Sequence, residues 1–154
     1  MKIYLDTSSL FKLYYVENDS IILERFLIEN NIVTIFLSEI SKIEFYSTVW
    51  KKVRNKEFEF EDAENIIHLF ENSLKNYIFI PVEKNILTRA KILVNKYGQE
   101  GLRTLDSIQL SCCLEIKNET DKYFTADKLL LTIFEKISPL NFFALYPKSF
   151  VTTD

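Results

Sequence analysis

The sequence predicts an α/β fold, in which helices cover both faces of a mostly parallel sheet. Short apolar runs rich in β-branched and aromatic residues alternate along the 154 residues with longer segments of helical periodicity. The chain between successive runs is long enough for the crossovers that parallel strands need. No repeat or low-complexity linker interrupts this order. We therefore expect residues 1–154 to form a single domain.

The first half of the chain begins with a strand at residues 2–5, which ends in an Asp-Thr-Ser-Ser sequence of good helix-capping residues. A helix is expected from about Ser9. A second strand is expected at residues 32–37, and Ser38 then caps a long helix. Apolar residues at helical spacing mark this helix: Ile40, Ile43, Tyr46, Trp50 and Val53.

The second half continues the alternation of helices and strands. Helices are expected at residues 61–76, 84–96, 104–117 and 128–136, the second of them ending near Gly98. Strands are expected at residues 77–82, 122–125 and 140–143. In a parallel sheet of this kind, functional groups gather at the carboxyl ends of the strands.

The composition suits a folded domain and excludes several classes of protein. The 22 acidic and 19 basic side chains give a net charge of −3 at pH 7, which argues against coating nucleic acid through bulk positive charge. No apolar stretch approaches the roughly 20 residues that cross a bilayer, and the amino-terminal apolar run is too short for a signal peptide. We therefore expect a cytoplasmic protein without a membrane partner. Cys112 and Cys113 are expected to be reduced core residues.

Two acidic residues follow predicted strands. Asp6 closes the first strand, and Asp127 lies just beyond the strand at residues 122–125. A parallel sheet places both at the same edge. Taken singly, each is explained by capping of the next helix, because Asp is a favoured N-cap residue. Capping does not account for two further acids.

Those two acids, Glu44 and Asp106, lie within predicted helices. Glu44 shares its helix face with Ile40 and with small residues such as Thr48, which leave room for a ligand. A surface position at the edge of the apolar stripe explains Glu44 equally well. Asp106 lies in the first turn of its helix, where the macrodipole favours an acid, but it precedes Leu110 on an apolar face.

Together the four acids indicate a metal site. Carboxylates that are close together repel one another and are costly to bury unless a cation neutralises them or some stay protonated. Oxygen donors with no His or Cys partner suit Mg²⁺ or Mn²⁺ better than zinc. Such a cation keeps waters, and a water made more acidic by the metal can attack a phosphodiester. The pattern therefore favours phosphodiester hydrolysis without a protein nucleophile.

The same residues resemble the motifs of a known family, the PIN domains, and most closely those of VapC-type ribonuclease toxins from toxin-antitoxin systems. The matching segments occur in the family's order and approximate spacing. They are Ile3-Tyr4-Leu5-Asp6-Thr7-Ser8, Glu44 in the helix after the second strand, Leu102-Arg103-Thr104-Leu105-Asp106-Ser107-Ile108-Gln109-Leu110, and Phe124-Thr125-Ala126-Asp127. The resemblance spans nearly the whole chain.

The resemblance implies a three-layer PIN-like fold, with a central sheet of about five strands flanked by helices. It implies a Mg²⁺- or Mn²⁺-dependent endoribonuclease with an RNA substrate and a cognate antitoxin as partner. The implied catalytic and metal-binding residues are Asp6, Glu44, Asp106 and Asp127, supported through hydrogen bonds by Thr7, Ser8 and Thr125. The aromatic first helices correspond to a region that contributes to dimers in the family, so we expect a homodimer.

Two further expectations concern partners. Arg103 immediately precedes the helix that carries Asp106 and is a predicted substrate or partner contact. The alternative to an enzyme is a non-enzymatic PIN-like scaffold that binds RNA or protein. Such a scaffold would be expected to have lost one or more of the four acids, and this sequence retains all of them.

Overall fold

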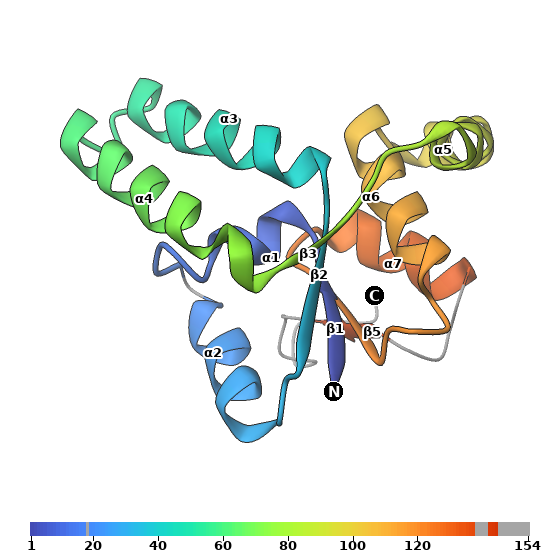
Figure 1. Ribbon diagram of the computed structural model, residues 1–154. Coiled ribbons are helices and arrows are strands. Elements are labelled where there is room, and N and C mark those ends of the chain that lie inside the picture. Colours follow the sequence, from blue (N-terminus) through green and yellow to red (C-terminus); the bar gives the residue numbers. More distant parts are fainter. Residues whose placement is uncertain (18, 138–141, 145–154) are drawn as a thin grey trace, which may run out of the picture.

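The computed structural model describes residues 1–17, 19–137 and 142–144. Its centre is a five-stranded sheet in which every neighbouring pair is parallel, in the order β3-β2-β1-β4-β5 (Figure 1). The strands are β1 (Lys2–Leu5), β2 (Thr34–Ser38), β3 (Ile78–Ile80), β4 (Lys122–Thr125) and β5 (Phe142–Ala144). The predicted α/β fold with about five parallel strands is confirmed.

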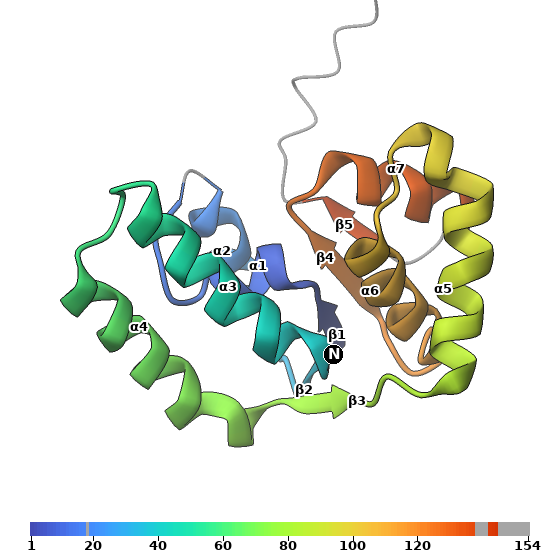
Figure 2. The same cartoon turned by 90° about the horizontal axis from the view of Figure 1, so that it is seen from above.

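Helices cover both faces of the sheet. They are α1 (Thr7–Phe11), α2 (Ser20–Glu29), α3 (Ile40–Arg54), α4 (Phe60–Ser73), α5 (Lys84–Tyr97), α6 (Thr104–Glu115) and α7 (Lys128–Ile137), with 3-10 turns η1 (Leu74–Asn76) and η2 (Gly98–Glu100). Figure 2 shows α1 to α4 on one side of the sheet and α5 to α7 on the other. The molecule therefore has the three layers that the sequence predicts.

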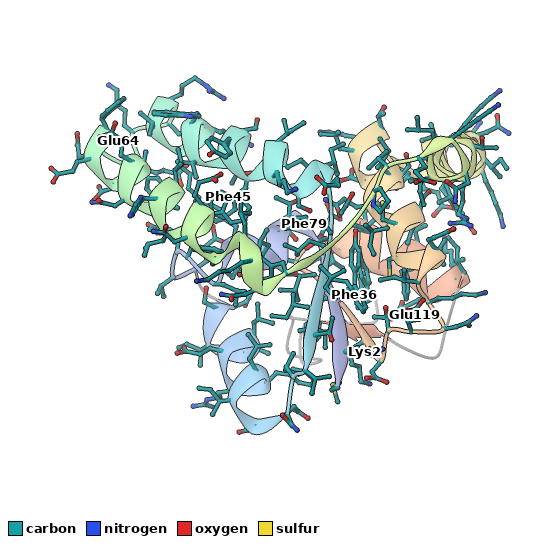
Figure 3. All side chains as sticks on the ribbon, in the orientation of Figure 1. Lys2, Phe36, Phe45, Glu64, Phe79 and Glu119 are labelled. Carbon is teal, nitrogen blue, oxygen red and sulfur yellow. The ribbon has the colours of Figure 1, made fainter. Side chains whose placement is uncertain are left out.

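Each layer of helices packs on its own set of strand side chains. Because successive side chains of a strand point to opposite faces, Ile3 and Leu5 of β1 join the core beneath α1 to α4. Tyr4 joins Phe36 and Tyr123 in the core beneath α5 to α7; Phe36 is labelled in Figure 3. Both faces of the short central strand are thereby buried, which fixes its register.

The strand order reverses direction beside β1. From β1 the chain runs outward to β2 and β3, and α5 and α6 then carry it back to β4 on the other side of β1. In open α/β sheets, ligands bind at such a switch point, outside the carboxyl ends of the strands. The backbone N–H of Asp6 donates to the carbonyl of Phe124 at 3.1 Å, so the two strand ends meet there.

The amino-terminal helices differ from the prediction. The first helix begins at Thr7 rather than about Ser9, because the Asp6 side chain caps it by accepting the Ser9 N–H. The sequence analysis placed no separate helix at α2. Ser38 ends β2, and Glu39 holds the N-cap position of α3, although the Ser38 hydroxyl still accepts the N–H of Ile40.

Other boundaries shift by a few residues. The expected helix at 61–76 divides into α4 and η1, and the expected strand at 77–82 shortens to three residues in β3. Residues 140 and 141 of the last predicted strand lie outside the described residues, whereas 142 and 143 belong to β5. Cys112 and Cys113 are free and buried, as predicted.

The apolar stripe predicted for α3 is only partly correct. Ile43 is 73% exposed, and the fully buried positions of the helix are Ser41, Phe45 and Val49. The buried face is therefore rotated relative to the stripe read from the sequence. Because this face contacts both α1 and α4, the covering elements decide which positions of the helix are buried.

The aromatic residues of the first helices pack within the chain. The rings of Phe45, which is labelled in Figure 3, and Phe70 stack with their centroids 4.0 Å apart. Tyr14 meets each of them edge-on, and Phe11 packs on Phe45 at 5.4 Å. Aromatic content here reflects a core and is no longer an argument for a homodimer, which stays a prediction.

No helix in the described part of the chain is both long enough and apolar enough to span a bilayer.

Candidate active site

The four acids come from four separate segments of the chain and line one pocket of about 290 Å³ at the carboxyl edge of the sheet. Asp6 follows β1 directly, and Asp127 follows β4 after one intervening residue. Glu44 lies in the second turn of α3, and Asp106 lies in the first turn of α6. The structure therefore brings together all four residues that the sequence analysis selected.

Asp6 is the most tightly held of the four carboxylates. It is only 4% exposed. Its Oδ1 accepts the N–H of Ser9 at 2.8 Å, its Oδ2 accepts the Thr125 hydroxyl at 2.6 Å, and Ser8 Oγ lies 2.8 Å from both oxygens as a further donor. Burial raises the pKa of Asp6 to about 6, although these hydrogen bonds act in the opposite direction.

Two hydroxyls join the ends of β1 and β4. Thr125 Oγ1, which donates to Asp6, accepts the N–H of Asp127 at 3.0 Å. Ser8 Oγ accepts the N–H of Ala126 at 2.9 Å. Asp127 Oδ1 in turn accepts the N–H of Leu130 in the first turn of α7 at 2.9 Å. Asp6 and Asp127 therefore cap helices and line the pocket at the same time.

Glu44 is held through one of its two oxygens. Its Oε2 accepts the Thr7 hydroxyl at 2.6 Å and the Gln109 side-chain amide at 2.5 Å. Within the described residues, its Oε1 accepts no hydrogen bond. One oxygen of a pocket-lining carboxylate is thus available to a ligand.

Asp106 is partly buried and its electrostatic surroundings are unfavourable. Burial, followed by the negative charges of Asp127 and Glu44, raises the pKa of Asp106. A backbone hydrogen bond from Arg103 and the charge of its side chain partly offset this effect. Arg103 itself is exposed at the N-cap of α6 and does not line the pocket.

Among the residues that the structure describes, no basic side chain forms a salt bridge with the four acids. In the described part of the chain, none of the four takes part in an ion pair. Lys12 and Lys52 lie at one side of the pocket, but both pair with Glu17, a fifth acid of the lining, at 3.0 and 3.1 Å. Within the described residues, the four carboxylates are therefore left without a salt-bridge partner.

This arrangement fits a hydrated divalent cation. Among residues 1–17 and 19–137, no group of three or more His, Cys, Asp or Glu side chains is arranged to hold a metal ion by itself. Mg²⁺ does not need such a cage, because it keeps several waters and binds through one or two carboxylates together with substrate phosphates. The four carboxylates without a salt-bridge partner among the described residues, and the Oε1 of Glu44 without a hydrogen bond among them, suit this kind of ion.

Two polar residues of the pocket lining, Gln109 and Glu17, were not selected as site residues from the sequence. Gln109 follows Asp106 by three positions, a spacing that puts both on one face of α6; this spacing was the available signal. Glu17 lies in the segment between α1 and α2. The only signal in the sequence was its separation of five residues from Lys12, with which it forms an ion pair. Thr48, singled out as a small neighbour of Glu44, does line the pocket.

Several solved structures with a similar fold come from toxins or toxin-antitoxin complexes. The chain resembles one from VapBC2 of Rickettsia felis bound to promoter DNA (18% identity, 94% of this chain and 98% of that chain, TM-score 0.60). It also resembles a chain of a toxin-antitoxin complex from Klebsiella pneumoniae (16%, 94% and 98%, TM-score 0.63). A third similar structure is Mycobacterium tuberculosis VapC20, described as a sarcin-ricin loop cleaving toxin (12%, 84% and 93%, TM-score 0.64).

At these identities the structural likeness establishes the fold alone. A search of curated proteins gave no match. The family comparison is more decisive, because residues 3–133 match the PIN domain family. That segment contains all five acids of the pocket and every residue that supports them through hydrogen bonds. The chain belongs to the PIN domain family.

Proposed function

We propose that this chain is a divalent-metal-dependent endoribonuclease. One observation carries the proposal: four carboxylates from four separate segments line a single pocket, and no basic side chain of the described residues forms a salt bridge with them. Asp6, Glu44, Asp106 and Asp127 would hold Mg²⁺ or Mn²⁺. When bound, the cation would make a water more acidic and stabilise the charge that develops on a phosphodiester.

The protein's own groups orient the acids. Ser8 and Thr125 hold Asp6 through hydroxyl donors, and the same hydroxyls fix the backbone that leads into Asp127. Thr7 holds one oxygen of Glu44. Fixing carboxylates before a cation arrives reduces the reorganisation that binding requires. Arg103, exposed beside Asp106, is the proposed contact for substrate or partner.

Membership of the PIN family and the solved neighbours support a role as the toxin of a toxin-antitoxin pair. VapC20 is described as a cleaving toxin, which supports cleavage as the activity. We accordingly propose RNA as the substrate and a cognate antitoxin protein as the partner. The proposal includes a single domain over residues 1–154, a cytoplasmic location and a homodimer.

The test is cleavage of total RNA and transfer RNA by purified, antitoxin-free protein in Mg²⁺ or Mn²⁺, with and without a chelator. Asp6→Asn and Asp106→Asn variants accompany the wild type. Discrete fragments that disappear with the chelator and with either substitution would support the proposal. A matched control is Asp121→Asn, because this aspartate accepts the N–H of Lys2 at 2.6 Å and does not line the pocket.

Two outcomes would contradict the proposal. If wild type leaves all folded RNA substrates intact in both metals, the chain is not this enzyme and the scaffold alternative gains. If Asp6→Asn cleaves as fast as wild type, the cleavage arises elsewhere or from a contaminant.

A further inference from the structure

Gln109 is a buried polar residue at the meeting point of four elements. It is 3% exposed, and it lines the pocket from α6. Its side chain contacts Tyr4 of β1, Thr7 of α1, and Ser41 and Glu44 of α3. A buried amide that is not hydrogen-bonded destabilises the fold, and Gln109 is hydrogen-bonded at both of its ends.

The two ends of the amide have different partners. Oε1 accepts the Tyr4 hydroxyl at 2.7 Å. Nε2 faces three acceptors, at 2.8 Å for Thr7 Oγ1, 3.0 Å for Ser41 Oγ and 2.5 Å for Glu44 Oε2. The amide therefore connects an uncharged donor in the core to a carboxylate in the pocket.

These partners allow only one orientation of the amide. If it were flipped, its oxygen would lie 2.5 Å from a carboxylate oxygen of Glu44, and two acceptors would repel. The Tyr4 side chain is fully buried, and its hydroxyl donates to the amide oxygen at 2.7 Å and to the backbone carbonyl of Gln109 at 3.2 Å. Tyr4 thus holds the amide with its nitrogen toward Glu44.

The consequence for Glu44 is an asymmetric carboxylate. Thr7 and Gln109 both donate to Oε2, while Oε1 accepts no hydrogen bond from the described residues. We propose that Gln109 is a positioning residue, which turns Glu44 so that Oε2 is tied to the protein and Oε1 is presented to a divalent cation. This inference rests on the proposed function, since it assigns the cation to the same pocket.

A purely structural role for Gln109 makes a different prediction. Loss of the amide would then lower the stability of the fold but leave cation binding by the folded protein unchanged. A positioning role predicts weaker cation binding even in a variant that folds fully. Replacement of groups that orient metal ligands typically weakens metal binding by about 10- to 100-fold.

The experiment is a calorimetric titration with Mn²⁺ alone, in the absence of RNA. Wild type is compared with Gln109→Met, which keeps the volume of the side chain and removes its donor. We expect Mn²⁺ binding to weaken by roughly 10- to 100-fold. Glu44→Gln and the double variant complete a mutant cycle, and the double variant should bind no more weakly than Glu44→Gln alone.

The matched control is Asn85→Leu. Asn85 donates to Glu115 Oε1 at 2.8 Å, so it is also an amide that holds a carboxylate on α6, but far from the pocket lining. This variant should bind Mn²⁺ as wild type does. If Gln109→Met does not fold, Tyr4→Phe is used instead, because it keeps the amide and removes only the donor that fixes its orientation.

The outcomes separate this inference from the proposed function. The positioning role is wrong if Gln109→Met binds Mn²⁺ as tightly as wild type does, or if the losses of Mn²⁺ affinity in Gln109→Met and Glu44→Gln add fully in the double variant. Neither result contradicts the proposed nuclease function. If wild type binds Mn²⁺ but does not cleave RNA, the proposed nuclease function is wrong. The mutant cycle then still decides whether Gln109 positions Glu44. If wild type binds no Mn²⁺, both are wrong.

Discussion

The two sides of the acidic pocket are built differently. The sheet wall consists of Asp6, Ser8 and Asp127, with the buried Thr125 behind it, and the helix wall consists of Glu44, Asp106 and Gln109. On the sheet wall, both oxygens of Asp6 are hydrogen-bonded. On the helix wall, Glu44 has one oxygen bonded and one free among the described residues.

The difference shows how one pocket can combine carboxylates that are fixed by hydrogen bonds with a carboxylate oxygen that is available to a ligand. The sheet wall joins the ends of two adjacent parallel strands, so backbone geometry determines where its carboxylates lie. Burial disfavours the charged form of Asp6. A charged Asp6 therefore destabilises the fold when no cation is present. On the helix wall, Glu44 and Asp106 are half-buried, and Glu44 keeps one oxygen available. The following predictions test this division.

The largest expected effect is on cleavage by Asp6→Asn. A metal contributes several kcal/mol to transition-state stabilisation, so loss of a charged ligand should slow RNA cleavage by about 100-fold or more. Single-turnover cleavage at saturating Mn²⁺ measures this loss. A rate within about tenfold of wild type would mean that the sheet wall is not part of the site.

The second effect is on stability in the absence of metal. The folded-state pKa of Asp6 is raised from 3.8 to about 6, so its contribution to stability is fully present below pH 4 and is lost as the pH rises through 6. The loss is on the order of 3 kcal/mol. Urea unfolding in chelator at pH 4 to 7.5 should show that Asp6→Asn lacks this part of the pH dependence. The prediction is contradicted if the free energies of unfolding of wild type and Asp6→Asn change with pH in the same way.

A smaller effect is expected from Thr125→Val. The change removes the hydroxyl that donates to Asp6 and the acceptor of the Asp127 N–H. We expect cleavage to slow by about 10- to 100-fold, as for other residues that orient metal ligands. The control is Thr132→Val, since the Thr132 hydroxyl bonds only to the Lys128 carbonyl on the exposed side of α7. Equal cleavage rates for the two variants would show that Thr125 does not orient the acids of the pocket.

The smallest effect is expected from Glu17→Gln. This acid lines the pocket but is neutralised by Lys12 and Lys52, and its side chain is 32% exposed. Partly exposed ion pairs contribute about 0.2–1 kcal/mol, so stability and Mn²⁺ affinity should change little. Thermal unfolding and the Mn²⁺ titration measure both. A loss as large as that of Asp6→Asn would make Glu17 a member of the site.

The sequence pattern was sufficient to place the two acids of the sheet wall, whereas the supporting roles of Ser8 and Thr125 came from the family resemblance. Apolar runs that end in Asp6 and Asp127 predict both strands, and the parallel order predicts that these acids meet at one edge. Strand periodicity and capping residues are local signals, so they can be read without knowledge of tertiary packing. The exact start of α1 was missed because the capping group is Asp6 itself rather than a later hydroxyl.

The helix wall was predicted less completely, because it depends on contacts between distant segments. Glu44 was recognised, but its hydrogen bond to Gln109 spans 65 residues and has no local signature. The burial of α3 likewise depends on α1 and α4, which is why Ile43 was expected on the apolar face and is exposed. The homodimer was inferred from aromatic residues that pack inside the chain instead.

The most direct test of the account is anomalous diffraction from crystals of wild type and Asp6→Asn soaked in Mn²⁺. The account predicts an anomalous peak in the pocket of the wild type, beside Oε1 of Glu44 and within reach of the other three acids directly or through one water. The same peak should be lost or much weakened in Asp6→Asn. A peak elsewhere on the molecule, or none in the wild type at saturating Mn²⁺, would contradict the assignment of this pocket as a metal-dependent active site.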